Sequence, residues 1–216
     1  MLLYLGIDEA GRGCLVGDMF VAAVALYDDV IELLANVGVK DSKKLPPNSR
    51  VKLFKVILSN TSYIYVRRYQ PDVIDTVNLN DLFIDAIRAS IKTAYKLGFK
   101  PTTVYVDSTS NIKKIINSLS DIIHHSTNLV VEYNADEKYI PVSAASIVAK
   151  VLRDKHVEYL KTLYGDFGSG YPSDPKTVKW IKDIVLTHSE LPPIVRRSWK
   201  TIKKVYSSVK TLDEYI

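Results

Sequence analysis

The chain has 216 residues, 47% of them hydrophobic and 25% charged, which suits one main folded domain and excludes a disordered or low-complexity chain. No apolar run approaches the ~20 residues that a membrane-spanning helix needs, and residues 1–11 lack the pattern of a signal peptide, so we expect a soluble, cytoplasmic protein. The single cysteine, Cys14, excludes an intramolecular disulfide, and 29 Lys plus Arg against 24 Asp plus Glu favours an anionic partner.

Short apolar stretches and helical patterns fill the first 164 residues. Apolar, β-branched segments predict five strands, over residues 2–7, 20–27, 62–69, 102–106 and 128–133. Apolar residues at three- and four-residue spacing predict helices that begin near residues 41–45, at Asn80 and at Val142, the last of them running to Tyr164. Three strands in succession, followed by helix and strand in alternation, predict an α/β fold with a mixed sheet, antiparallel on one side and parallel on the other.

The C-terminal part of the chain has a different character. Residues 165–172 are dense in turn formers, and a short helix is predicted over residues 175–186. We therefore predict a main domain over residues 1–164 and a small helical region over residues 165–216. Basic residues, with no acidic one among them, lie between Leu191 and Leu212: Arg196, Arg197, Lys200, Lys203, Lys204 and Lys210.

Acidic residues follow three of the predicted strands. Asp8 and Glu9 end the first strand, Asp107 directly follows the fourth, and Asp136 lies just past the fifth. If these three strands are neighbours, the four acids converge, and clustered carboxylates repel one another unless they are protonated or bridged by cations. Mg²⁺ or Mn²⁺ is the natural bridge, and a carboxylate-bound metal pair ~4 Å apart holds the attacking and leaving oxygens of a phosphodiester. The pattern therefore predicts a metal-dependent nuclease.

Other interpretations of the acids stay open at this point. Each Asp taken alone is typical of a turn or helix cap. A glycosidase also uses two carboxylates, although adjacent residues such as Asp8 and Glu9 point to opposite faces of a strand and two further acids have no role there. A non-enzymatic nucleic-acid-binding module needs only the basic C-terminal region. Cleavage that depends on a divalent ion separates these alternatives.

An ordered set of motifs resembles a known family. The motifs are residues 6–13 (GIDEAGRG), 41–45 (DSKKL), 105–108 (YVDS), 135–136 (AD), 143–154 (SAASIVAKVLRD) and 168–174 (GSGYPSD). Together they resemble ribonuclease HII, the type 2 ribonuclease H, and residues 195–201 (VRRSWKT) resemble its archaeal branch. The resemblance implies a ribonuclease H-like sheet with a small C-terminal helical region. It also implies hydrolysis of the RNA strand of RNA/DNA hybrids and cutting at single ribonucleotides embedded in duplex DNA, with 3′-hydroxyl and 5′-phosphate products.

The resemblance also implies roles for single residues. Asp8, Glu9, Asp107 and Asp136 match the catalytic acids, which bind two divalent ions, Mg²⁺ or Mn²⁺. Gly11, Arg12 and Gly13 match the loop that contacts the ribonucleotide and its 2′-hydroxyl, largely through backbone groups. Tyr171 matches a tyrosine that packs on the sugar at the RNA–DNA junction. From the residues alone, Tyr171 is typical of a turn aromatic that stabilises its loop.

Basic side chains are expected to hold phosphates. These are Lys43 and Lys150, with Ser146 four residues before Lys150 on one helix face, and the basic run over residues 196–204. Without the resemblance, Lys43 and Lys150 are typical of solvated surface charge. Cys14 and Asp18 stand where the family commonly has proline, which predicts a looser loop after Gly13.

The extreme C-terminus carries a degenerate docking pattern. Val209, Leu212, Tyr215 and Ile216 resemble the peptide by which replication and repair enzymes dock on the sliding clamp, although a frayed tail, or a Tyr215 packed on its own domain, fits slightly better. Otherwise we expect a monomer whose partners are RNA/DNA hybrids and ribonucleotide-containing duplex DNA, with no membrane partner.

Overall fold

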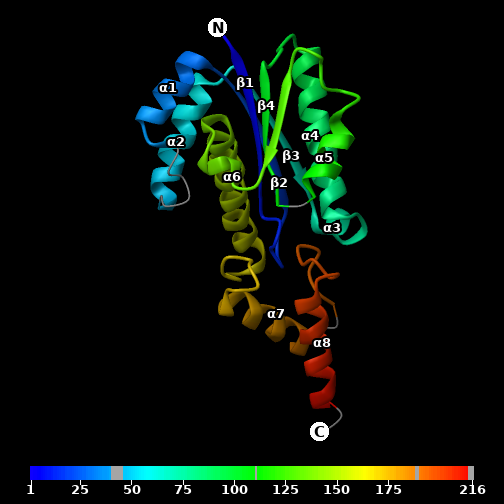
Figure 1. Ribbon diagram of the computed structural model, residues 1–216. Helices are drawn as coiled ribbons and strands as arrows, with labels where there is room; N and C mark the ends of the chain where they lie inside the picture. Colours follow the sequence, from blue (N-terminus) through cyan, green and yellow to red (C-terminus); the bar gives the residue numbers. More distant parts are fainter. Residues whose placement is uncertain (40–45, 110, 188–189, 214–216) are drawn as a thin grey trace. The chain divides into compact units, whose positions relative to one another are not determined.

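The computed structural model describes residues 1–39, 46–109, 111–187 and 190–213, with side chains up to Ser207 (Figure 1). Its elements, in chain order, are β1 (Leu3–Ala10), β2 (Met19–Tyr27), α1 (Asp28–Asn36), α2 (Pro47–Asn60), β3 (Tyr63–Tyr69), α3 (Pro71–Thr76), α4 (Leu79–Lys96), β4 (Thr103–Asp107), α5 (Ile112–Leu119), β5 (Asn128–Glu132), the 3-10 helix Ala135–Glu137, α6 (Ile140–Tyr164), α7 (Pro175–Thr187) and α8 (Lys200–Asp213). None of these helices is both long enough and apolar enough to cross a bilayer in the described ranges.

One five-stranded sheet organises the strands, in the order β3-β2-β1-β4-β5. Strand β1 is antiparallel to β2 and parallel to β4, and β4 is parallel to β5. The predicted mixed sheet, with its antiparallel and parallel sides, is therefore confirmed. Strands β1, β4 and β5 are neighbours, which is the condition for the acids at their carboxyl ends to approach one another.

Four helices were not predicted individually. Helix α1 begins directly after β2, with Asp28 and Asp29 in its first turn, where acidic side chains favour the positive end of a helix dipole. Its apolar pattern is too short to separate from the strand before it. The brief helices α3 and α5 lie in segments where no helix was predicted, and α8 lies in the region expected only to be helical in general.

The chain divides into two compact units by its internal contacts. Unit 1 comprises residues 1–10, 20–67 and 80–152, and unit 2 comprises residues 11–19, 68–79 and 153–216. Each unit is thus built from separate stretches of the chain. The domain boundary expected at residues 164 and 165 falls inside unit 2 and stays a prediction.

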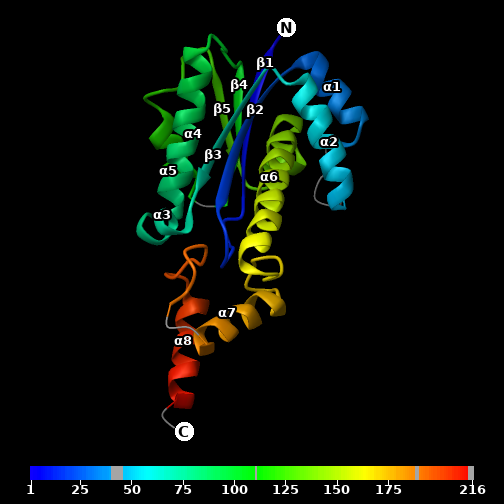
Figure 2. The same ribbon diagram turned by 180° about the vertical axis from the view of Figure 1, so that it is seen from behind.

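Unit 1 is layered. Figures 1 and 2 show α1, α2 and the first part of α6 on one face of the sheet, and α4 and α5 on the other. The side chains of β2 pack with those three helices in one continuous buried cluster, which includes Val24, Leu34, Phe54 and Ile147. Burial of this apolar area is the main favourable contribution to folding of the unit.

Helix α6 begins in direct contact with β1. A Cβ atom added at Gly6 would lie 2.0 Å from the carbonyl carbon of Pro141, so only glycine allows this approach. The contact fixes the start of α6 against the strand that carries Asp8. Ser146 and Lys150 follow further along the same helix.

Unit 2 has a core of its own. Leu15 and Val16 pack there with apolar residues of α6, α7 and α8, among them Leu160, Ile181 and Ile202. Trp199 packs against the same cluster, as a core anchor rather than an exposed ring.

Candidate active site

Asp8 and Asp107 lie where the parallel strands β1 and β4 approach their ends. Ile7 is opposite Val106, and each is followed by one of the two aspartates. Asp8 is only 5% exposed. Its burial, and secondly the charge of Asp107, raise the pKa of the Asp8 carboxyl to about 7 from 3.8. The structure therefore brings these two acids close enough to repel.

Ser146 and Lys150 of α6 lie beside the same carboxyl group. A hydrogen bond from Ser146 and the charge of Lys150 both lower the pKa of Asp8, but burial and Asp107 outweigh them. The Lys150 ammonium donates a hydrogen bond to Ser146 Oγ at 2.7 Å. Both side chains that we expected at phosphates are thus part of the surroundings of Asp8.

Asp136 is positioned by the turn that follows β5. Asn134 adopts a left-handed conformation, with φ of 55°, and the chain then enters the 3-10 helix. The backbone N–H of Ala135 donates to Asp107 Oδ1 at 2.7 Å, which holds this turn against the end of β4. Asp136 itself is 3% exposed, and Ser143 donates a short hydrogen bond to its carbonyl oxygen.

Glu9 takes a different direction. It is partly exposed, and its Oε1 accepts a hydrogen bond from Thr109 Oγ1 at 3.0 Å. Thr109 lies two residues beyond Asp107, so the side chain of Glu9 reaches the segment that leaves β4.

This donor set fits a hard divalent cation. Buried carboxylates that repel one another gain most when a cation replaces protons between them, and carboxylate oxygens are the ligands that Mg²⁺ and Mn²⁺ prefer. In the part of the chain that the structure describes, no three Asp, Glu, His or Cys side chains already have the spacing of a closed metal site. The metal-binding role of the four acids stays a prediction.

The Gly11–Gly13 loop belongs to unit 2 and is organised by Arg196. This arginine is fully buried, and its guanidinium donates to the carbonyl oxygens of Gly11 at 2.6 Å, Arg12 at 2.7 Å and Gly17 at 2.9 Å. We expected Arg196 among the phosphate contacts of the basic run, and that expectation is wrong. A side chain with no exposed surface and with carbonyl partners cannot contact a phosphate on a bound duplex.

Tyr171 lies in the same unit, against a second buried arginine. The guanidinium carbon of Arg153 is 4.5 Å from the centroid of the Tyr171 ring, and the same side chain donates to Cys14 Sγ at 3.1 Å and to the carbonyl of Ser169. Burial raises the pKa of the Tyr171 hydroxyl, and the neighbouring Cys14 raises it further. The Arg153–Asp154 ion pair, at 3.0 Å, is also present.

Backbone contacts tie these two segments of unit 2 together. The N–H groups of Leu15 and Val16 both donate to the carbonyl oxygen of Gly170, at 2.7 and 3.2 Å. The loop that begins at Gly11 and the segment that carries Tyr171 are therefore brought together; their role in substrate binding stays a prediction.

Asp18 supplies a side-chain anchor where a proline was expected. Its carboxylate is 4% exposed and lies 2.9 Å from Arg68 Nε and 3.2 Å from His156 Nε2. The contacts of Asp18 with Arg68 and His156, and the contact of Cys14 with Arg153, thus hold a loop that lacks the two prolines. Nothing in the sequence pattern indicated these contacts.

Some predicted residues lie outside what the structure describes. Lys43 falls in residues 40–45, and Tyr215 and Ile216 follow the last described residue. The side chains of Val209 and Leu212 are also outside the described set, although their backbone is part of α8.

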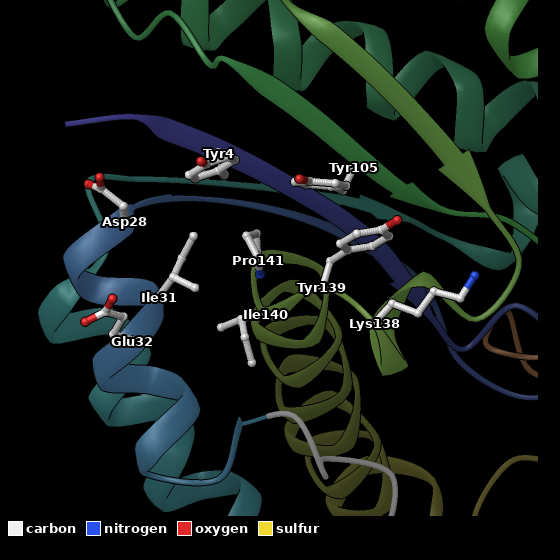
Figure 3. Close-up of a pocket in the computed structure, with 9 residues that line it drawn as sticks. All are labelled: Tyr4, Asp28, Ile31, Glu32, Tyr105, Lys138, Tyr139, Ile140 and Pro141. Carbon is white, nitrogen blue, oxygen red and sulfur yellow. The ribbon is translucent and has the colours of Figure 1, made fainter.

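A separate cavity of unit 1 contains none of the predicted site residues. It has a volume of about 390 Å³ and lies between β1, β4, α1 and the start of α6 (Figure 3). Tyr105 stacks on Tyr139, with ring centroids 4.2 Å apart. The ring of Tyr4 also stacks on that of Tyr105, with centroids 6.2 Å apart. These rings pack on one another over the sheet, while the acids lie further along β1 and β4, toward the ends of the strands.

Comparisons with known proteins identify the family. Residues 5–202 match the family model of ribonuclease HII. Ribonuclease HII of Sulfurisphaera tokodaii is 45% identical over 94% of this chain and 96% of its own length, and that of Pyrococcus furiosus is 41% identical over 97% and 96%.

Solved structures agree with this. Ribonuclease H2 from Pyrococcus horikoshii has a TM-score of 0.85 at 36% identity, over 97% of this chain and 99% of that chain. A chain of the PCNA:RNase HII complex from Archaeoglobus fulgidus has a TM-score of 0.81 at 37% identity, over 94% and 96%. With its ribonuclease H-like sheet and a family match over nearly its whole length, the chain belongs to the ribonuclease HII family and is a metal-dependent endonuclease of the ribonuclease H type.

Proposed function

We propose that this enzyme cuts the RNA strand of RNA/DNA hybrids and also cuts at single ribonucleotides embedded in duplex DNA, by two-metal hydrolysis that leaves 3′-hydroxyl and 5′-phosphate ends. The observation that carries the proposal is the buried Asp8 carboxyl beside Asp107, whose pKa is raised to about 7. Two buried carboxylates that repel each other, and that the fold does not need for its stability, are typical of a site that binds a cation.

Asp8, Glu9, Asp107 and Asp136 would hold two Mg²⁺ or Mn²⁺ ions. When bound, such ions lower the pKa of water and stabilise the charge that develops on the phosphodiester. The protein's own part is orientation. The N–H of Ala135 holds the Asp107 carboxylate in one direction, and the Ser146–Lys150 pair places a positive charge beside Asp8.

Substrate choice would come from unit 2. The 2′-hydroxyl is the group that distinguishes RNA from DNA at a given nucleotide, and a glycine-flanked loop can approach it with backbone donors. Tyr171, held over Arg153, would pack on the sugar at the RNA–DNA junction. The phosphates of the duplex would be contacted by Lys43, Lys150 and the exposed basic residues that follow Arg196.

A single duplex tests this function. DNA with one embedded ribonucleotide should be cut at that site in Mg²⁺ or Mn²⁺ and left intact in EDTA, while the same duplex made only of DNA should be left intact in both. Mapping both ends of the cut gives the chemistry of the products. Equal cutting of the all-DNA duplex, or cutting in EDTA, would contradict the proposal.

A second proposal concerns the sliding clamp and a role in replication and repair. Support comes from the relative of known structure that is a PCNA:RNase HII complex, and from the apolar residues Val209, Leu212, Tyr215 and Ile216. Deletion of residues 212–216 should abolish binding to the clamp of the same organism and leave cleavage of a short duplex unchanged. A variant with those five residues in scrambled order is the matched control for length and composition, and it should also fail to bind. Clamp binding by the deletion variant at the parent's affinity would exclude the tail as the docking peptide.

A further inference from the structure

The buried guanidinium of Arg196 has an unusual set of partners. Two of its three acceptors, the carbonyl oxygens of Gly11 and Arg12, belong to consecutive peptide groups, and the third is that of Gly17. Among the described residues, no carboxylate forms an ion pair with Arg196. Burial lowers the pKa of this guanidinium to about 10, so it stays protonated at neutral pH. A buried positive charge is therefore directed at the carbonyl side of the Gly11–Gly13 loop.

Peptide geometry converts this contact into an orientation of the opposite side of the loop. None of the described peptide bonds is cis, and in a trans peptide the N–H points away from the C=O. The peptide that ends in the Gly11 carbonyl carries the N–H of Arg12, and the next peptide carries the N–H of Gly13. Because Arg196 draws both carbonyls to itself, both N–H groups point away from it. Successive N–H groups with a common direction form a concave site for an acceptor.

The turn has no freedom to change this direction. Gly11 has a φ of 84°, and a Cβ added there would lie 2.7 Å from the carbonyl oxygen of Asp18. The N–H of Cys14 donates to the Gly11 carbonyl at 3.4 Å, which closes the turn over Arg12 and Gly13. Asp18 in turn is fixed by Arg68 and His156.

Gly13 is the open member of this turn. It is exposed, and a Cβ added there would meet nothing within 4 Å. Within the described ranges, no backbone hydrogen bond uses its N–H. The Gly13 N–H belongs to the same peptide group as the Arg12 carbonyl, and that carbonyl accepts a hydrogen bond from the Arg196 guanidinium, which polarises the peptide. An exposed, polarised N–H that points outward is suited to an oxygen acceptor on a ligand.

We propose that Arg196 is a positioning residue for recognition of the ribonucleotide, because it aims the N–H groups of Arg12 and Gly13 at the 2′-hydroxyl. This inference depends on the proposed function, in which the loop contacts the ribonucleotide. Arg196 itself touches no substrate atom. Its effect on the enzyme is carried by the two peptide groups that it holds.

The test measures binding preference rather than activity alone. Duplex DNA with one ribonucleotide and the same duplex without it are titrated in EDTA, and the ratio of the two dissociation constants is compared between variants. Arg196→Lys keeps the charge but cannot reach three carbonyls, so the preference should fall about tenfold, the value of one hydrogen bond, while affinity for the all-DNA duplex stays unchanged. Arg88→Lys is the control, because its guanidinium pairs with the Asp121 carboxylate and not with the loop, and it should keep the parent's preference.

A second pair of variants leaves the buried arginine in place. Gly13→Pro removes the N–H, and should lose the preference as Arg196→Lys does. Gly13→Ala keeps the N–H and should therefore keep a larger preference than Gly13→Pro. If Arg196→Lys fails to fold by circular dichroism, the Gly13 pair decides the question.

The outcomes separate this inference from the proposed function. A parent enzyme that neither prefers nor cuts the ribonucleotide duplex contradicts the function. If the parent prefers and cuts the ribonucleotide duplex, but folded Arg196→Lys or Gly13→Pro keeps the parent's preference, the proposed role of Arg196 is wrong and the proposed function still stands.

Discussion

The two units bury charge in opposite ways. In unit 1, carboxylates are buried next to one another, and Asp8 keeps a pKa of about 7 because Asp107 and burial both oppose its ionisation. In unit 2, guanidinium groups are buried among carbonyl oxygens, and Arg196 has an acceptor for each of the atoms Nε, Nη1 and Nη2. Buried charge that remains opposed by its neighbours indicates a site for a ligand, while buried charge whose hydrogen bonds are satisfied indicates a scaffold.

The largest expected effect is on catalysis in unit 1. Asp8→Asn should lower the rate of cutting at an embedded ribonucleotide in Mg²⁺ by at least about a thousandfold, because a neutral amide replaces a carboxylate that we propose to bind the metal. Asp107→Asn and Asp136→Asn should behave alike. Asp29→Asn, an exposed acid of α1, is the control and should cut at the parent's rate. Parent-like turnover by Asp8→Asn would remove the acids from the mechanism.

The second effect has the opposite sign and appears without metal. A carboxyl group whose pKa is raised in the folded state destabilises that state as pH rises from about 4 toward 7. In EDTA at pH 8, Asp8→Asn should therefore unfold at higher denaturant concentration than the parent, by up to roughly 4 kcal/mol in free energy of unfolding.

The control for this prediction is pH itself. At pH 3.5 the Asp8 carboxyl is protonated in the folded state and mostly protonated in the unfolded state, so the difference between the parent and Asp8→Asn should nearly vanish. An equal difference at both pH values would mean that the amide changes packing rather than charge.

The third prediction removes a satisfied charge from unit 2. Arg196→Met leaves the carbonyls of Gly11, Arg12 and Gly17 without their buried donor, and should lower the free energy of unfolding by about 3 kcal/mol at every pH from 5 to 9. Chemical denaturation gives the value. Arg197→Met should cost less than about 1 kcal/mol, because that side chain is exposed. A cost for Arg196→Met no larger than that of Arg197→Met would remove the contrast between the units.

The smallest effect concerns Lys150, which has both a contact inside the protein and a proposed contact with the substrate. Its ammonium bonds Ser146 beside Asp8, yet it is also expected at a phosphate. Lys150→Ala should flatten the slope of log affinity against log salt by about 0.9, the contribution of one phosphate contact to B-DNA. The exposed Lys52→Ala is the control. An unchanged slope would leave Lys150 only its contact with Ser146 and Asp8.

Much of this architecture was predictable from the sequence. Strands such as Leu3–Ala10 are apolar and short, and acids at the carboxyl ends of parallel strands are expected at one edge of a sheet. The role of Arg196 was not predictable, because its acceptors are backbone carbonyls 179 to 185 residues away in the sequence. A basic residue in a basic run is typical of a solvated surface, and backbone acceptors have no signature in the side-chain pattern. The anchor at Asp18 was missed for a similar reason, since Arg68 and His156 lie far from it along the chain.

The contact between Gly6 and Pro141 constrains how this enzyme can evolve. Even the smallest side chain at position 6 would place its Cβ 2.0 Å from the backbone of α6, so the helix would have to shift away from the strand. Such a shift would carry Ser146 and Lys150 away from Asp8. Because both side chains lower the pKa of Asp8, a substitution at Gly6 would raise that pKa further. Position 6 should therefore tolerate no residue other than glycine. A library randomised at this position and selected for cleavage should return glycine alone.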